Sequence, residues 1–220
     1  MSSGWWFAEF WASDPSIAVS WVVWVIVSVV LHELAHGWAA IRLGDRTPIE
    51  MGRMTVNPLV HMGRTSLIVF AIIGIAWGAM PVNPSRLRGR YADALVSAAG
   101  PAMNLALALL LMLAGGVWLG RNGFQTADPL NTNLLTYFWV GASLNVFLML
   151  FNLLPIPPFD GSRILGSVSP ALGRLMHSEQ ARMGVFVLFA VMFFWGAQYI
   201  FQAAFTAGSF GIGIIALIVG

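Results

Sequence analysis

His32, Glu33 and His36 stand in an otherwise apolar stretch, and they are the residues whose types and spacing most clearly offer chemistry. An α-helix places residues four positions apart on one face, about 5–6 Å from one another. His32 and His36 can therefore bind one Zn²⁺ ion, and Glu33 can act as a general base toward water at the metal. Ionisable groups are costly at membrane depth and indicate function there. The alternative is that the two histidines only form hydrogen bonds to neighbouring helices.

The composition limits the class of protein. Of the 220 residues, 58% are hydrophobic and only 9% are charged, whereas a soluble domain carries about 25% charged residues. The chain is therefore expected to be an all-α polytopic membrane protein in one domain, with the lipid bilayer as a partner and no nucleic acid. It contains no cysteine, so a metal site must use histidine and carboxylate ligands.

Apolar runs indicate where the chain crosses the bilayer, which takes about 20 helical residues. Runs of that length occupy residues 16–43, 94–120, 134–154 and 183–206. Two shorter runs cover residues 65–80 and 209–220, and the second would form a partial last span. About five to six transmembrane helices follow from this pattern. In the polar loop 45–64, polarity alternates around Gly52 and predicts a small membrane-associated β-hairpin.

The arginines decide between two topologies for residues 65–80. If this segment spans the membrane, the eleven arginines divide five to six between the two sides. If it is re-entrant, ten share one face and only Arg121 lies opposite, which agrees with the positive-inside rule. Re-entrant backbone is tolerated where protein or a water-filled cavity covers it. The first span then runs from the outside to the cytoplasm, with His32 and His36 in its cytoplasmic half.

A third metal ligand has to come from another segment, because catalytic zinc usually takes three protein ligands and one water. Asp160 follows the 134–154 run in the stretch Asn152-Leu-Leu-Pro-Ile-Pro-Pro-Phe-Asp160-Gly161. Three prolines prevent a continuing helix and stiffen the segment, so they predict a rigid arm that presents one carboxylate. The alternative is a polar turn that simply ends a helix.

Three further polar residues are weaker candidates. Asn104 lies in the middle of an apolar run, where a helix-packing hydrogen bond and a catalytic contact are both open. Asn152 is expected to cap or brace the proline-rich arm. His61 is expected to be a solvated loop histidine rather than part of the site.

Several ordered motifs resemble the site-2 protease family of intramembrane zinc metalloproteases, in a compact bacterial branch without extra domains. The motifs are His32-Glu-Leu-Ala-His36, Asn57-Pro-Leu-Val-His61, Met80-Pro-Val-Asn-Pro84, Gly100-Pro-Ala-Met-Asn104 and Asn152…Pro155…Asp160-Gly161. The resemblance implies that His32, His36 and Asp160 bind one zinc ion and that Glu33 is the general base. It also makes Asn104 and Asn152 candidates for holding substrate or oxyanion. Phe159 departs from the leucine that usually precedes the Asp-Gly pair.

The function implied by this resemblance is hydrolysis of a peptide bond in or near a transmembrane helix of a substrate protein. The expected setting is regulated proteolysis in a bacterial plasma membrane, with the active site toward the cytoplasm. A substrate helix must unwind before cleavage, and an edge strand of residues 49–56 could pair with the unwound backbone. A membrane metal transporter with the same ligands, or an inactive adaptor that retains the fold, are the alternatives.

Overall fold

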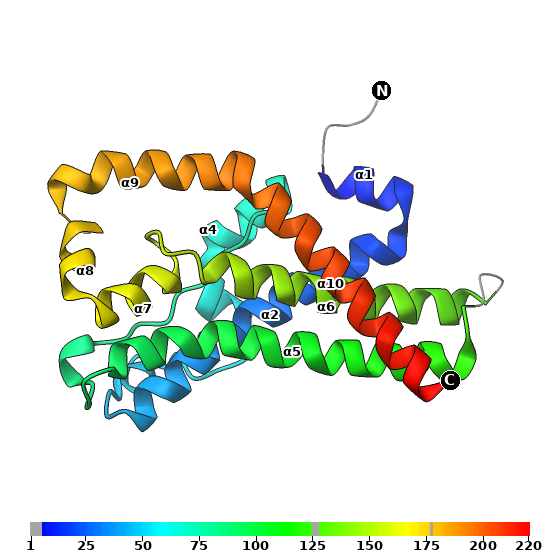
Figure 1. The fold of residues 1–220 in the computed structure, drawn as a ribbon, viewed down its shortest axis with the longest axis horizontal. Helices are drawn as coiled ribbons and strands as arrows, with labels where there is room; N and C mark the ends of the chain where they lie inside the picture. Colours follow the sequence, from blue (N-terminus) through cyan, green and yellow to red (C-terminus); the bar gives the residue numbers. More distant parts are fainter. Residues whose placement is uncertain (1–5, 125–127, 177) are drawn as a thin grey trace.

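The structure, a computed structural model, describes residues 6–124, 128–176 and 178–220. Within these residues the chain forms helices and turns and no strand, so the expected all-α class is confirmed. The helices are α1 (Trp6–Ser13), α2 (Pro15–Arg42), α3 (Thr47–Glu50), α4 (Pro58–Ile73), the 3₁₀ turn η1 (Pro84–Arg86), α5 (Ala92–Asn122), α6 (Pro129–Asn152), α7 (Asp160–Val168), α8 (Pro170–Met176), α9 (Glu179–Val191), the π-helical turn η2 (Met192–Gly196) and α10 (Ala197–Val219). Figure 1 shows α5 and α6 lying along the length of the molecule, with α10 crossing them diagonally.

Aspartate or asparagine followed by proline begins three of the longer helices. Asp14, Asn57 and Asp128 accept a hydrogen bond from the amide two residues further on, at 2.8, 3.0 and 2.9 Å. Each side chain satisfies an amide that the first helical turn leaves free, and the fixed φ of the following proline suits that turn. These local signals explain why α2, α4 and α6 start where they do.

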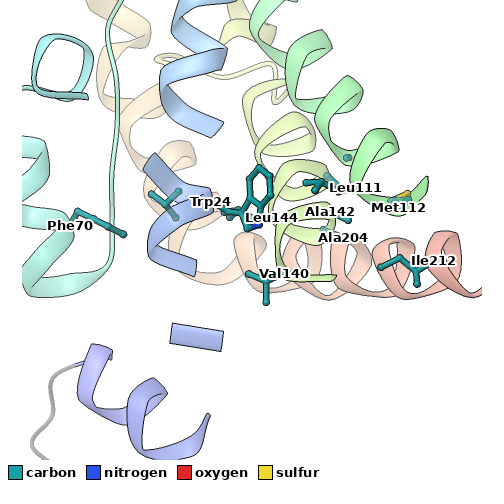
Figure 2. Close-up of a cluster of buried hydrophobic side chains, with 12 residues drawn as sticks. Trp24, Phe70, Leu111, Met112, Val140, Ala142, Leu144, Ala204 and Ile212 are labelled. Atoms are coloured by element: carbon teal, nitrogen blue, oxygen red, sulfur yellow. The ribbon is translucent and has the colours of Figure 1, made fainter. Parts of the chain in front are cut away.

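The apolar core lies where α2, α5, α6 and α10 meet. Figure 2 shows Trp24 of α2 beside Leu144 of α6 and Leu111 of α5, with Ile212 of α10 at the edge of the cluster. A Cβ atom on Gly141 would lie 2.5 Å from the Trp24 indole. The glycine therefore lets α2 and α6 approach closely, as small residues do between membrane helices.

Four helical segments are long and apolar enough to cross a membrane, judged by length and composition. They are Pro15–Arg42, Ala92–Asn122, Pro129–Asn152 and Met183–Val219. The last combines α9 and α10 through η2, whereas the sequence suggested a break near residue 207. α4 is apolar but shorter. The sequence predicts about five to six transmembrane helices, whereas the described residues contain four helical segments long enough to span a membrane.

The predicted β-hairpin in the 45–64 loop is wrong. Residues Thr47–Glu50 form the short helix α3, and the chain then turns at Gly52 with a positive φ of 63°. The Asp45 carboxylate accepts hydrogen bonds from the Thr47 amide and hydroxyl and from the Asn83 amide, at 3.0, 2.5 and 2.7 Å. These bonds, which lower the pKa of Asp45 although burial alone would raise it, fold the segment as a capped turn instead of two strands.

After α4 the chain turns at Gly74 and runs back beside it without regular secondary structure, in what we call the return segment (residues 74–83). The Ser66 hydroxyl donates to the Trp77 carbonyl and accepts from the Trp77 amide, at 2.7 and 2.9 Å. The Ala79 amide donates to the His61 carbonyl at 3.0 Å. The return segment therefore brings the chain back to the level at which α4 began.

Candidate metal centre

His32 and His36 project from α2 toward α5, and two groups on α5 orient their rings. His32 Nδ1 lies 2.6 Å from Asn104 Oδ1, and His36 Nδ1 lies 2.7 Å from the Val96 carbonyl oxygen. Asn104 and Val96 are eight residues apart, about two helical turns, so both lie on one face of α5. Because each Nδ1 is turned toward an acceptor on α5, both Nε2 atoms are left facing each other as potential metal ligands.

Asp160 joins the histidines from the proline-rich arm that follows α6. α6 ends at Asn152, residues 153–159 are not helical, and Asp160 is the first residue of α7. A Cβ atom on Gly161 would lie 2.2 Å from the Leu153 carbonyl oxygen, so only glycine lets the arm fold so tightly.

The three side chains are arranged as a tetrahedral metal would require. The Nε2 atoms of His32 and His36 are 3.0 Å apart, and Asp160 Oδ2 lies 3.2 and 3.4 Å from them. A tetrahedron with metal–ligand bonds of about 2.0–2.1 Å has edges of about 3.3 Å. Among the residues that the structure describes, these three form the one group of potential ligands gathered within 4.8 Å. Two imidazoles and a carboxylate are a donor set suited to zinc.

Gly100 of α5 leaves the space that such an ion needs. A Cβ atom at this position would lie 2.5 Å from the Nε2 atoms of both His32 and His36. Any larger residue would therefore displace the two ligand atoms. The close approach of α5 to α2 at Gly100 is part of the site and not only a feature of helix packing.

Glu33 lies between two cavities beside this centre. One cavity of about 340 Å³ is lined largely by apolar side chains, including Val29 and Phe151. The other, of about 290 Å³, is more polar and is also lined by Asp160 and Arg163. The Glu33 side chain is buried and borders both cavities. It can therefore reach a substrate or a water in either of them.

The return segment crosses directly over Glu33. A Cβ atom on Gly78 would lie 2.7 Å from Glu33 Cγ and 2.8 Å from Glu33 Oε1. Gly78 borders both cavities. Its neighbours in the segment border one cavity each, Ala76 the apolar cavity and Met80 the polar cavity. The segment thus forms a wall of the site, with glycine at the point of closest contact.

The weaker sequence candidates occupy different positions. Asn104 is fully buried; its Oδ1 faces His32 and its Nδ2 donates to Asn145 at 2.9 Å. Asn152 borders both cavities, and its amide nitrogen donates to the Leu148 carbonyl at 3.0 Å. His61 is 2% exposed, so the expectation of a solvated histidine is wrong. Its Nε2 lies 2.5 Å from the Thr55 carbonyl oxygen, which draws the ring into the 53–61 turn.

Two contacts near the centre were not expected from the sequence. Arg163 of α7 pairs with Asp93 of α5 at 2.6 Å and so ties the helix that carries Asp160 to the helix that orients the histidines. Asn145 of α6 contacts Asn104. A buried amide in the middle of an apolar helix was the available signal for Asn145, because such a group needs a partner.

Comparison with known proteins places this arrangement in a family. The model described as "Peptidase family M50" matches residues 20–130 and 122–195. The Bacillus subtilis protein named "Putative zinc metalloprotease YwhC" is 37% identical over 174 residues, which is 78% of each chain. The Mycolicibacterium smegmatis protein "Putative zinc metalloprotease Rip2" is 34% identical over 159 residues, 67% of this chain and 55% of Rip2.

A third relative, "Putative zinc metalloprotease MJ0611" of Methanocaldococcus jannaschii, is 31% identical over 144 residues, which is 62% of this chain and 63% of that protein. No solved structure matches the chain. The expected family resemblance is confirmed, and the chain belongs to peptidase family M50, the site-2 protease family.

Proposed function

We propose that the protein is an intramembrane zinc metalloprotease that hydrolyses a peptide bond in or near a transmembrane helix of a substrate protein, in regulated intramembrane proteolysis. The observation that carries this proposal is the group formed by His32, His36 and Asp160, with Glu33 beside it, inside a bundle of helices of spanning length. Membership of peptidase family M50 and the names of the relatives support a zinc-dependent protease activity.

In this proposal His32, His36 and Asp160 hold one zinc ion per chain. When bound, zinc supplies Lewis-acid chemistry, making water more acidic and polarising a carbonyl oxygen. Glu33 takes the proton from the attacking water and delivers it to the leaving amine. The apolar cavity on one side of Glu33 suits an apolar substrate side chain, and the polar cavity on the other suits the entry of water.

The two asparagines take different roles. The Asn152 side chain borders both cavities and is the better placed to hold the carbonyl oxygen of a substrate. Asn104 borders the apolar cavity as well, but its amide is engaged with His32 and Asn145, so we assign it to holding the metal ligand rather than the substrate.

The return segment is suited to bind an unwound substrate backbone. Trp77 and Ala79 bond to α4, whereas no hydrogen bond in the described structure involves the backbone of Ala76 or Gly78. The alternate residues Trp77 and Ala79 both bond to α4, as in a β-strand, whose alternate residues present their backbone groups to opposite sides. Ala76 and Gly78 therefore offer free groups near Glu33 for pairing with a substrate by β-augmentation. This segment, not the 49–56 loop, would supply the edge.

We also propose that α4 and the return segment enter and leave the membrane on its cytoplasmic side. The Ala79–His61 hydrogen bond and a bond of 2.8 Å from the Arg88 amide to the Leu43 carbonyl hold both ends of this region near the end of α2. The resulting ten-to-one distribution of arginines agrees with the positive-inside rule. The metal centre would then face the cytoplasm of a bacterial cell.

Cysteine accessibility tests this topology, because the native chain has no cysteine. In intact cells, a membrane-impermeant thiol reagent is expected to label Asn122→Cys but neither Arg64→Cys nor Arg88→Cys. All three are expected to react once the membrane is opened. Labelling of Arg88→Cys from outside, with Arg64→Cys protected, would mean that the region crosses the membrane and would contradict the proposed orientation.

A Gly100→Ala substitution is expected to lower zinc affinity at least tenfold, because the added methyl would lie 2.5 Å from both ligand nitrogens. Gly184→Ala in α9 is the control, since no atom lies within 4 Å of its added Cβ. Zinc retained per chain after dialysis against a series of chelator concentrations measures the effect. Equal retention by wild type and Gly100→Ala would place the metal elsewhere.

A further inference from the structure

Three buried side chains beside the metal centre link α2, α5 and α6 through hydrogen bonds. His32 of α2 contacts Asn104 of α5 at 2.6 Å, and Asn104 Nδ2 donates to Asn145 Oδ1 of α6 at 2.9 Å. Asn145 Nδ2 in turn donates to the Gly141 carbonyl, also at 2.9 Å. Both asparagines are fully buried, and Asn104 also borders the apolar cavity beside Glu33.

The Gly141 carbonyl, which ends this series, determines which group donates in each of its hydrogen bonds. The Gly141 carbonyl can only accept, so Asn145 must present its amino group there and its oxygen to Asn104. Asn104 must then donate its amino group to Asn145 and present its own oxygen to His32. His32 Nδ1 therefore has to carry the proton, and Nε2 keeps the lone pair that a metal requires.

From this arrangement, which rests on the proposed zinc site, we propose that Asn145 is a positioning residue that fixes the tautomer of His32 through Asn104. Asn145 is not one of the three potential ligands and does not line either cavity beside them. Without Asn145, Asn104 is free to turn its amino group toward His32, where it would favour a proton on Nε2 and compete with the metal. His36 needs no such series, because the Val96 carbonyl accepts from it directly.

Asn131 provides a matched control on the same helix. It is 2% exposed, accepts a hydrogen bond from the Trp118 indole at 2.7 Å and donates one to the Gly123 carbonyl at 3.0 Å. It stands fourteen residues before Asn145, about 21 Å along the helix. Replacing either asparagine by leucine removes a buried amide with two hydrogen bonds, but only Asn145 is connected to His32.

The test is zinc affinity, measured by chelator competition on the purified full-length protein, together with thermal unfolding of the metal-free protein. Asn145→Leu is expected to lower zinc affinity 10- to 100-fold, the range found when supporting partners of metal ligands are removed. Asn131→Leu is expected to leave zinc affinity unchanged, although both variants lower the unfolding temperature. Wild-type affinity in Asn145→Leu, or an equal loss in Asn131→Leu, would overturn the proposal.

A double-mutant cycle separates action through Asn104 from a general effect on the bundle. If Asn145 acts through Asn104, then Asn104→Leu combined with Asn145→Leu is expected to bind zinc no more weakly than Asn104→Leu alone. Losses that multiply would show that Asn145 acts by another route. If Asn145→Leu is not recovered from the membrane, Asn145→Ser, whose hydroxyl cannot reach both partners, takes its place with the same outcomes.

His32→Ala in the same assay distinguishes the two proposals. Zinc loss in His32→Ala together with wild-type affinity in Asn145→Leu would refute only the role of Asn145. Full zinc retention in His32→Ala would refute the metal site itself and with it the proposed function.

Discussion

Replacement of Glu33 by glutamine is expected to lower the rate of substrate cleavage by about 10²-fold or more while the protein keeps its zinc. Glutamine has nearly the same shape as glutamate but cannot accept a proton from water. Glu33 is not one of the three grouped ligand residues, so the metal should remain. The measurement is cleavage of a single-span substrate protein that is co-reconstituted in liposomes, with zinc content determined on the same preparation.

Glu9→Gln serves as the control, because Glu9 is exposed on α1 and has no role in the site. Near-normal cleavage by Glu33→Gln would show that the protease mechanism is wrong. The same liposomes also test the transporter alternative, in which Glu33→Gln retains zinc flux across the bilayer. An inactive adaptor would show no cleavage even in the wild-type protein. The Glu33→Gln protein is also suited to trap the natural substrate for identification.

Loss of any one ligand is expected to remove zinc from the purified protein. His32→Ala, His36→Ala and Asp160→Ala each leave only two protein ligands, where catalytic zinc usually has three. We expect about one zinc per chain in the wild type and close to none in each variant, by elemental analysis after dialysis. Asp128→Ala is the control for an aspartate that caps a helix but lies outside the cluster.

Asp160→Ala is the most informative of the three variants, because its ligand role rests on a contact between segments far apart in the sequence. Full zinc retention by Asp160→Ala would remove Asp160 from the site. The contact of Asp160 Oδ2 with both Nε2 atoms would then be an ion pair only.

The parts of the site that could be predicted from the sequence are those set by local geometry. Helical spacing alone places His32 and His36 on one face of α2. The prolines between Asn152 and Asp160 prevent a helix and predict the arm that carries the carboxylate. The same holds for the starts of α2, α4 and α6, where an Asp-Pro or Asn-Pro pair caps the helix.

The features that could not be predicted depend on contacts between distant segments. Alternating polarity suggested a hairpin at 49–56, but the Asp45 side chain bonds to Thr47 and to Asn83, and these bonds fold the loop as a turn. Local side-chain bonds of this kind compete with strand pairing, and the short pattern carried no information about Asn83. The sequence also leaves the role of Asn104 open, because its partner Asn145 lies 41 positions away.

X-ray absorption at the zinc edge of the purified wild-type protein tests the central claim most directly. The proposed site predicts four nitrogen or oxygen ligands at about 2.0–2.1 Å, two of which show the scattering pattern of imidazole. The other two are the Asp160 carboxylate and an exchangeable water. A spectrum with fewer than two imidazole ligands, or a purified protein that binds no zinc, would contradict a metal centre built from His32, His36 and Asp160.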